Sequence, residues 1–312
     1  MPSPSKICWP EGKAFAFTIF DDTDRSTVAN LRYLYDFLHD WGLRTTKSVW
    51  TLKGNGEKSA GDTCDNGEYL AWAKSLQEKG FEIGFHNATY HTSLREQTQA
   101  GLEKFFEFFG HWPHALANHQ NNEEGIYWGD ARLTNPNKLI YNILTKFRNK
   151  NKFRGHVKGD QLFWGDLCQK YIKYVRSFIH NDLNTLKQCP YMPYHDPDRP
   201  YVKWWFTSSD GSSVKIFNQT LTEKNQDRLE EEGGACIMYT HFGNGFYQDG
   251  LLDNNFRRLM ERLSQKNGWF VPVSTLLDYL REQRGEKVIS PSERLLLECR
   301  WLIYKIGVGG TS

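Results

Sequence analysis

Three short apolar segments that end in acidic or imidazole side chains constrain the fold more than any other feature of the chain. Residues 14–24 read AFAFTIFDDTD, and the apolar run ends in Asp21 and Asp22. Residues 80–91 read GFEIGFHNATYH, and residues 233–246 read GGACIMYTHFGNGF. Each apolar run has the length and alternation of a buried strand. Because parallel α/β sheets bind ligands at the carboxyl ends of their strands, we expect these polar side chains to meet at one edge of a sheet.

The segments between the first strands have the periodicity of helices. Apolar side chains recur at helical spacing in residues 27–41, and Gly42 follows as a C-terminal stop. Residues 45–52 have the pattern of the next strand, and residues 68–79 form a second amphipathic segment. This alternation predicts a parallel sheet with helical crossovers.

The alternation is lost in residues 118–207, which contain the basic and proline-rich tracts RNKNKFRGHVKGD and CPYMPYHDPDRPYVKWW. We interpret this stretch as further strands with long loop insertions, and not as a separate domain; the loops form either a lid over a site or only a cover for one end of the sheet. The chain is therefore predicted to form one main domain over residues 1–289. An amphipathic helix and tail follow over residues 290–312.

At the level of motifs the chain resembles the polysaccharide deacetylase family, the carbohydrate esterase family 4 or NodB-homology type. Residues 18–22 resemble its Asp-Asp motif, residues 82–86 its histidine-bearing strand, and residues 237–241 its final strand ending in histidine. A segment like 270–282 normally follows that strand. The resemblance covers residues 13–282. It implies an α/β fold, a distorted (β/α) barrel of seven strands with long loop insertions.

The resemblance also implies a metal-dependent carbohydrate N-deacetylase. One divalent ion, with zinc as the first expectation, would be held by Asp22, His86 and His91, leaving positions open for water and substrate as in catalytic sites. Asp21 would take a proton from water as general base, and His241 would protonate the leaving amine. The same donor set would also accept cobalt, nickel or manganese.

The chain departs from the family pattern in two places, and each leaves alternatives open. The histidines of the second motif are five residues apart instead of four, so His119 or Asp24 is an alternative ligand to His91. The arginine motif that holds the catalytic aspartate in the family is missing, and Arg154 or Arg176 is a possible substitute.

Candidate substrate contacts come from polar and aromatic residues in the irregular stretch. Aromatic faces stack on sugar rings as well as fill cores. With aromatic residues at 15% of the chain, most of them are expected to be core. The side chains singled out as substrate contacts are Asn118, His119, Arg154 and Trp205.

Composition narrows the expected partners and place of action. A net charge of +2 argues against nucleic acid as a partner. The six cysteines show no paired spacing, as in a reducing compartment. The first residues lack an apolar signal segment, and no run approaches the ~20 apolar residues of a membrane span. We therefore expect a cytoplasmic enzyme that deacetylates a sugar nucleotide or lipid-linked glycan in bacterial surface-polysaccharide (lipopolysaccharide) synthesis.

Two other functions remain open: a catalytically degenerate glycan-binding or scaffold protein of the same fold, and a deformylase or other C–N hydrolase. The C-terminal segment also has two interpretations. Residues 292–305 are apolar and basic, as in a helix on the surface of the inner membrane. We favour the alternative that this helix docks on the barrel or on a second subunit.

Overall fold

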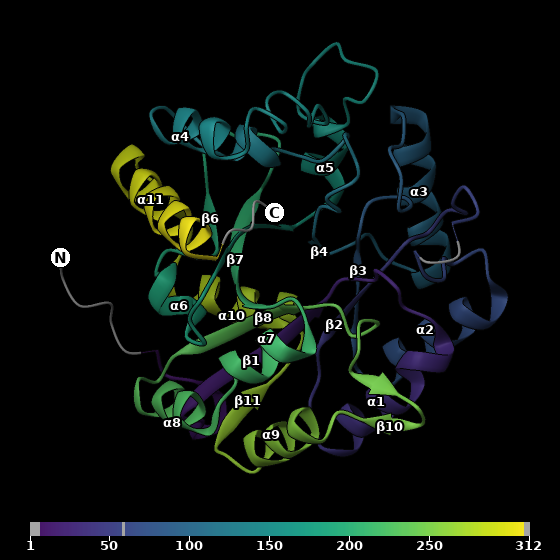
Figure 1. Cartoon of the computed structure of the whole chain (residues 1–312), viewed down its shortest axis with the longest axis vertical. Helices are drawn as coiled ribbons and strands as arrows, with labels where there is room; N and C mark the ends of the chain where they lie inside the picture. The colour runs from purple at the N-terminus through teal and green to yellow at the C-terminus, as the bar shows by residue number, and fades with distance from the viewer. Residues whose placement is uncertain (1–6, 58–59, 309–312) are drawn as a thin grey trace.

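A closed barrel of parallel strands forms the centre of the computed structural model, which describes residues 7–57 and 60–308 (Figure 1). The barrel predicted from the sequence is confirmed. The barrel is closed by the strand at residues 235–240, which pairs with the first strand, at residues 15–21, and with the strand at residues 204–211. In order around the barrel, the seven strands are β1 (Phe15–Asp21), β2 (Thr46–Val49), β3 (Glu82–Phe85), β4 (Ala115–Leu116), β5 (Tyr174–His180), β7 (Trp204–Gly211) and β8 (Ala235–Thr240).

The register of β1 with its neighbours places motifs that are distant in the sequence at the same end of the barrel. Asp21 lies opposite Thr240 of β8 and opposite Lys47 of β2. The residues that follow β1 and β8 therefore emerge side by side, with Asp22 next to His241 in register. The sequence expectation that the strand ends meet at one edge is confirmed for these two strands.

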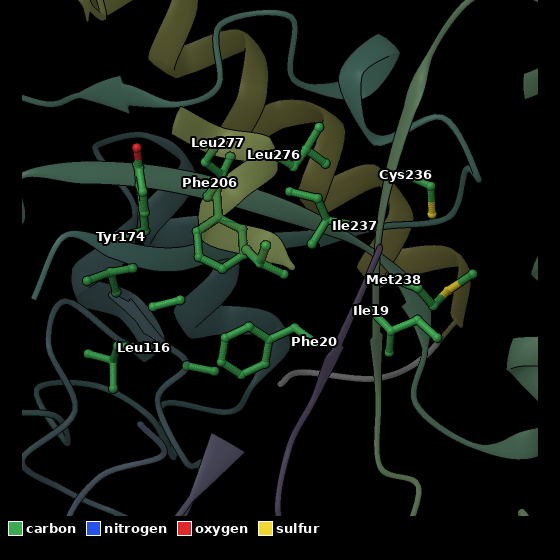
Figure 2. Packing of buried hydrophobic residues seen from close by; sticks show 14 of the residues in the cluster. Ile19, Phe20, Leu116, Tyr174, Phe206, Cys236, Ile237, Met238, Leu276 and Leu277 are labelled. Carbon is green, nitrogen blue, oxygen red and sulfur yellow. The ribbon is translucent and has the colours of Figure 1, made fainter. Parts of the chain in front are cut away.

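Side chains on β1 alternate between the barrel interior and the helix layer, as the strand period of two requires. Phe20 points inward, where its ring centroid lies 6.2 Å from that of Phe206 on β7. Figure 2 shows these two rings and Ile237 packed among the neighbouring strands. The interior is thus filled by packed side chains and is not an open channel.

Helices surround the barrel and begin and end where the sequence signals lie. The helix α1 (Val28–Asp40) begins after Thr27, whose side chain accepts a hydrogen bond from the backbone N–H of Asn30. The helix α3 (Arg95–Phe109) ends at Gly110, which has a φ of 78°. The other helices of this layer are α2 (Gly67–Glu78), α7 (Val214–Thr220), α8 (Glu223–Glu231), α9 (Asn254–Ser264) and α10 (Val273–Arg284).

Short strands extend the sheet at its margins. The strand β11 (Gly268–Phe270) pairs in parallel with the start of β1. The strand β6 (Tyr194–His195) is antiparallel to β7, and β12 (Lys287–Val288) pairs with β6. A separate hairpin is formed by β9 (Tyr247–Gln248) and β10 (Leu251–Leu252).

The irregular stretch of the sequence contains the strands β5 and β6 and the start of β7, and the rest of it forms short helices and loops. Trp164 fastens it to the site loops, because its indole N–H donates to the carbonyl oxygen of Glu124 at 2.6 Å. Arg95 on α3 makes two further bonds to the carboxylate of Asp166, at 2.6 and 2.7 Å. The short helices of the chain are η1 (Pro10–Gly12), η2 (Gly129–Arg132), α4 (Asn137–Leu144), α5 (Gly165–Tyr171) and α6 (Thr185–Gln188).

The C-terminal helix α11 (Pro291–Val308) packs against β5 and α4. Leu297 and Trp301 are fully buried in this contact, and the Trp301 ring lies 5.6 Å from that of Tyr141 on α4. Docking of this helix on the body of the protein is confirmed, whereas a domain boundary at residue 289 stays a prediction. In the described part of the chain, no helix is long and apolar enough to span a bilayer.

Candidate active site

A cavity of about 60 Å³ lies at the carboxyl ends of the barrel strands. Loops after β1, β3, β4 and β8 contribute to it, as does the interior of β5. This volume accommodates a few water molecules or a small acyl group, but not a sugar ring. The polar side chains that line the cavity include Asp22, Asp24, His86, His119, Arg176, Tyr239 and His241.

Three of these side chains form a compact group of possible metal ligands: Asp24, His86 and His119. The Nε2 atom of His86 lies 3.1 Å from Oδ2 of Asp24, and Nε2 of His119 lies 3.0 Å from Oδ1 of the same carboxylate. All three ligand atoms fall within 4.8 Å of one another. We call this group the Asp24 triad.

The two histidines of the Asp24 triad are held differently. Asn122 fixes His119, because Nδ1 of the imidazole lies 2.7 Å from the Asn122 side-chain oxygen. With its proton on Nδ1, the ring presents a free lone pair at Nε2, as a metal ligand must. His86 packs its ring near Trp50, at 5.9 Å between centroids, and its Nδ1 has no hydrogen-bond partner among the described residues.

The charges within the triad stabilise one another. Burial tends to raise the pKa of Asp24, but hydrogen bonds from His119 and His86 outweigh it and hold that pKa well below its usual range. Burial lowers the pKa of His119, yet the hydrogen bond to Asp24 overcomes this effect and raises it. The Asp24 carboxylate therefore favours positive charge beside it, either as protonated histidine or as a bound cation.

Asp22 is held in the same cavity by Arg176, a residue in the middle of β5. The guanidinium makes two bonds to the carboxylate, with Nη1–Oδ1 at 2.8 Å and Nη2–Oδ2 at 2.5 Å. Both side chains are almost completely buried. A two-bond contact of this kind fixes the carboxylate plane as well as its charge. Arg176 was one of two alternatives to the missing arginine motif, and its sequence signal is a charge within the apolar run YVRSFIH.

Asp21, by contrast, points into the helix layer. Its carboxylate accepts a hydrogen bond from Tyr35 at 3.0 Å and from the backbone N–H of Phe242 at 2.8 Å, and it lies 3.1 Å from Nζ of Lys47. Burial raises the pKa of Asp21 although Lys47 opposes the shift, and burial also lowers the pKa of Lys47. Asp21 does not line the cavity, because adjacent residues at the end of a strand face opposite sides.

His241, the first residue after β8, faces the cavity through Nε2. Its Nδ1 lies 3.1 Å from the carbonyl oxygen of Ser212, which orients the ring. Its Nε2 lies 3.3 Å from the Tyr239 hydroxyl and 3.7 Å from Oδ2 of Asp24. One nitrogen is thus anchored and the other is available to exchange a proton inside the cavity.

Comparison with known proteins adds evidence on the fold. No protein-family model matches the sequence, and the search of curated proteins finds no significant match. Among solved structures, a probable polysaccharide deacetylase from Pseudomonas aeruginosa PAO1 is similar with a TM-score of 0.51 at 12% identity, over 91% of this chain and 96% of that one. Puue allantoinase is similar with a TM-score of 0.51 at 13% identity, over 91% of this chain and 95% of the allantoinase chain.

The chain has the NodB-type polysaccharide deacetylase fold. At these identities the likeness concerns the fold alone, and the chemistry has to be argued from the side chains in the cavity.

Within the polysaccharide deacetylase fold of this chain, His91 is separated from the cavity. Asn87 has a φ of 62° and turns the chain away directly after His86. Asn122 then ties the loop down by donating to the carbonyl oxygens of Thr89 and His91, both at 2.9 Å. The His91 ring bonds to the neighbouring Thr92 carbonyl at 3.1 Å. The structure therefore assembles His86 with Asp24 and His119, and does not bring together the expected set with Asp22 and His91.

The substrate contacts expected from the sequence are dispersed. Asn118 lines the cavity, but its amide is engaged in two hydrogen bonds with the backbone of Ile126. Arg154 pairs with Asp160 at 2.8 Å, away from the cavity lining. Trp205 is 3% exposed and borders a second small cavity instead. The tryptophan that lines the active-site cavity is Trp128 instead.

A buried carboxylate, Glu124, supports the loop that holds His119. Its oxygens accept hydrogen bonds from Asn122 at 2.6 Å, and from Asn87 and the backbone of Ser93 at 3.2 Å each. Burial raises the pKa of Glu124 to about 7, although these hydrogen bonds act to lower it. The site scaffold thus contains a group that changes its charge near neutral pH.

Glu124 is expected to make the stability of the protein depend on pH. The folded state keeps its proton up to about pH 7, whereas the unfolded chain releases it near 4.5. The free energy of unfolding should therefore decrease by up to about 3 kcal/mol as the pH rises through this window. Chemical denaturation at several pH values gives the free energy of unfolding of the wild type and of Glu124→Gln. We expect this free energy to fall with rising pH in the wild type and to change less in the variant. The exposed neighbour Glu123→Gln serves as control and should retain the wild-type slope.

Proposed function

We propose that the chain is a metal-dependent hydrolase that removes an N-acetyl group from an amino sugar. The observation that supports this function is the convergence of the Asp24 triad with Asp22 and His241 in one small cavity. A ligand group, a fixed carboxylate and an oriented imidazole are the parts that hydrolysis of an amide requires.

The donor set of the triad fits a divalent ion. Two imidazole nitrogens and one carboxylate are common catalytic zinc ligands, and ligand atoms around a tetrahedral ion lie roughly 3.3 Å apart. The Asp24 contacts of 3.0 and 3.1 Å are close to that spacing. In the proposal, Asp24 and His119 thus take the places expected for Asp22 and His91, and zinc is the proposed ion. A bound ion would supply Lewis acidity, polarising the amide carbonyl and acidifying water.

The remaining roles are assigned to two residues of the cavity. Asp22, held by Arg176, takes the proton of the attacking water as the oxygen adds to the carbonyl carbon. His241 gives a proton from Nε2 to the amide nitrogen as the carbon–nitrogen bond breaks, so that acetate and a free amine leave. Asp21 has no part in these steps, because its oxygens are engaged with Lys47, Tyr35 and the backbone of Phe242.

The size of the cavity supports a small acyl group. A volume of about 60 Å³ admits an acetamide, while the sugar would remain outside the cavity. The proposed substrates are an N-acetylated sugar nucleotide or a lipid-linked glycan of surface-polysaccharide synthesis. The same volume favours a formyl group equally well, so a deformylase is the second candidate.

Product analysis tests this proposal. Protein reloaded with zinc or cobalt is incubated with N-acetylated and N-formylated forms of the same amino sugars, and acetate, formate and free amine are measured. Release of acetate with an equal amount of amine, lost in Asp22→Asn, is the expected result. Release of formate alone would replace the deacetylase by a deformylase. No product from any substrate, with metal bound, would favour a glycan-binding protein.

A further inference from the structure

An apolar surface on the inserted helix α4 is left uncovered by the residues that the structure describes. The sequence NKLIYNIL turns only Tyr141 and a few polar side chains toward the protein. Large apolar residues of α4 and the loop after it face outward with exposed fractions of 42–57%: Leu139, Ile140, Ile143, Leu144 and Phe147. An exposed apolar patch of this size usually marks a surface that binds a membrane or another protein.

The C-terminal helix α11 extends the same surface. It packs beside α4, as Figure 1 shows, and Cys299 of α11 contacts Asn137 of α4. Ile303 lies one turn beyond Cys299 on the same face, and it is 72% exposed. Ile306, three residues further on, is 59% exposed. Together with the exposed apolar residues of α4 and Phe147, these two residues form what we call the α4–α11 surface.

The inserted segment that carries α4 contains basic side chains but no acidic ones. Residues 131–159 contain no Asp or Glu. Lys146, Arg148 and Lys150 are exposed, and none of the three makes an ion pair with the described residues. Of the other basic residues of the segment, Arg132 is buried, Lys138 and Arg154 pair with Asp130 and Asp160, and the remaining two are Lys152 and Lys158.

We propose that the α4–α11 surface binds an anionic lipid membrane, with the apolar side chains entering the interface and the basic side chains contacting lipid headgroups. An exposed apolar helix face bordered by Lys and Arg is the pattern of helices that lie in a membrane surface. A second copy of the chain fits less well. A two-fold symmetric contact would bring the same basic residues of both copies together. This inference does not depend on the reaction proposed for the cavity.

Vesicle binding tests the proposal on the full chain. Co-sedimentation is measured with phosphatidylcholine vesicles and with vesicles that also contain phosphatidylglycerol. We expect clear preference for the anionic vesicles, and weaker binding at high salt. The double variant Ile143→Glu, Phe147→Glu should bind them roughly tenfold less or worse, since it places charge where the apolar face enters the lipid.

Matched variants separate the surface from general effects. Lys146, Arg148 and Lys150 changed together to Gln should remove the preference for anionic vesicles. Leu251→Glu alters an apolar residue on β10 that is even more exposed, at 72%, and lies across the molecule in Figure 1; this variant should bind as the wild type does. All these side chains are exposed, so the variants should fold. Absence of wild-type binding, or equal binding by the double variant, would overturn the proposal. A wild-type dimer that the double variant dissociates would also overturn it, in favour of a second copy.

Discussion

Replacing His119 by alanine is expected to abolish metal binding, whereas replacing His91 by alanine should leave it intact. In the structure Nε2 of His119 lies 3.0 Å from Asp24, while His91 bonds to a backbone carbonyl outside the cavity. Elemental analysis of protein purified without a metal-affinity tag should find about one ion per chain in the wild type and in His91→Ala, as a catalytic site of three ligands requires. Asp24→Ala and His86→Ala should lose the ion with His119→Ala.

The same variants test the ligand assignment against its alternative. If hydrolysis is found, activity should fall by roughly a thousandfold or more in His119→Ala and by less than about twofold in His91→Ala. Loss of the ion in His91→Ala, with retention in His119→Ala, would restore the set expected from the family motif. Circular dichroism and thermal unfolding of each variant distinguish ligand loss from misfolding.

Replacing Arg176 by methionine should damage both stability and activity. It would leave the Asp22 carboxylate buried without its two guanidinium bonds. Removing one partner of a buried ion pair typically costs about 3–5 kcal/mol. The proposed base would also lose its orientation, so we expect a fall in turnover of about a thousandfold. Urea unfolding and product release measure the two effects.

A second substitution separates these effects of Arg176. Asp22→Asn combined with Arg176→Met removes the buried charge as well as its partner. The double variant should recover much of the lost stability but none of the activity, since the carboxylate is then absent. If Arg176→Met alone proves as stable and active as the wild type, the proposed role of the Asp22–Arg176 pair is wrong.

The barrel and its polar end were predictable because strand patterns are local. The residues of β1 and β8 alternate and end in acids or histidine, and this repetition was visible in the sequence. The face on which each carboxylate lies follows from the same alternation. Asp22 has the parity of the inward-facing Phe20, so its place in the cavity and the outward direction of Asp21 are consequences of the strand period.

The ligand set depended on features that local patterns do not contain. His119 follows β4, a strand of only two residues, Ala115–Leu116, in a segment without a clear strand signal. It meets His86 because β4 pairs with β3 at Phe85 and Leu116. The turn at Asn87 that removes His91 is a backbone conformation which asparagine tolerates but does not require. Arg176 likewise needed the placement of β5, which lies in the stretch where the alternation of strand and helix patterns is lost.

Anomalous X-ray scattering at the zinc edge, from crystals of zinc-loaded protein, would test the site most directly. The account predicts one strong peak within bonding distance of Asp24, His86 and His119, with Asp22 and His241 near it but not bound to it. A peak held by Asp22 and His91, or no peak in the cavity of protein that retains zinc, would contradict it.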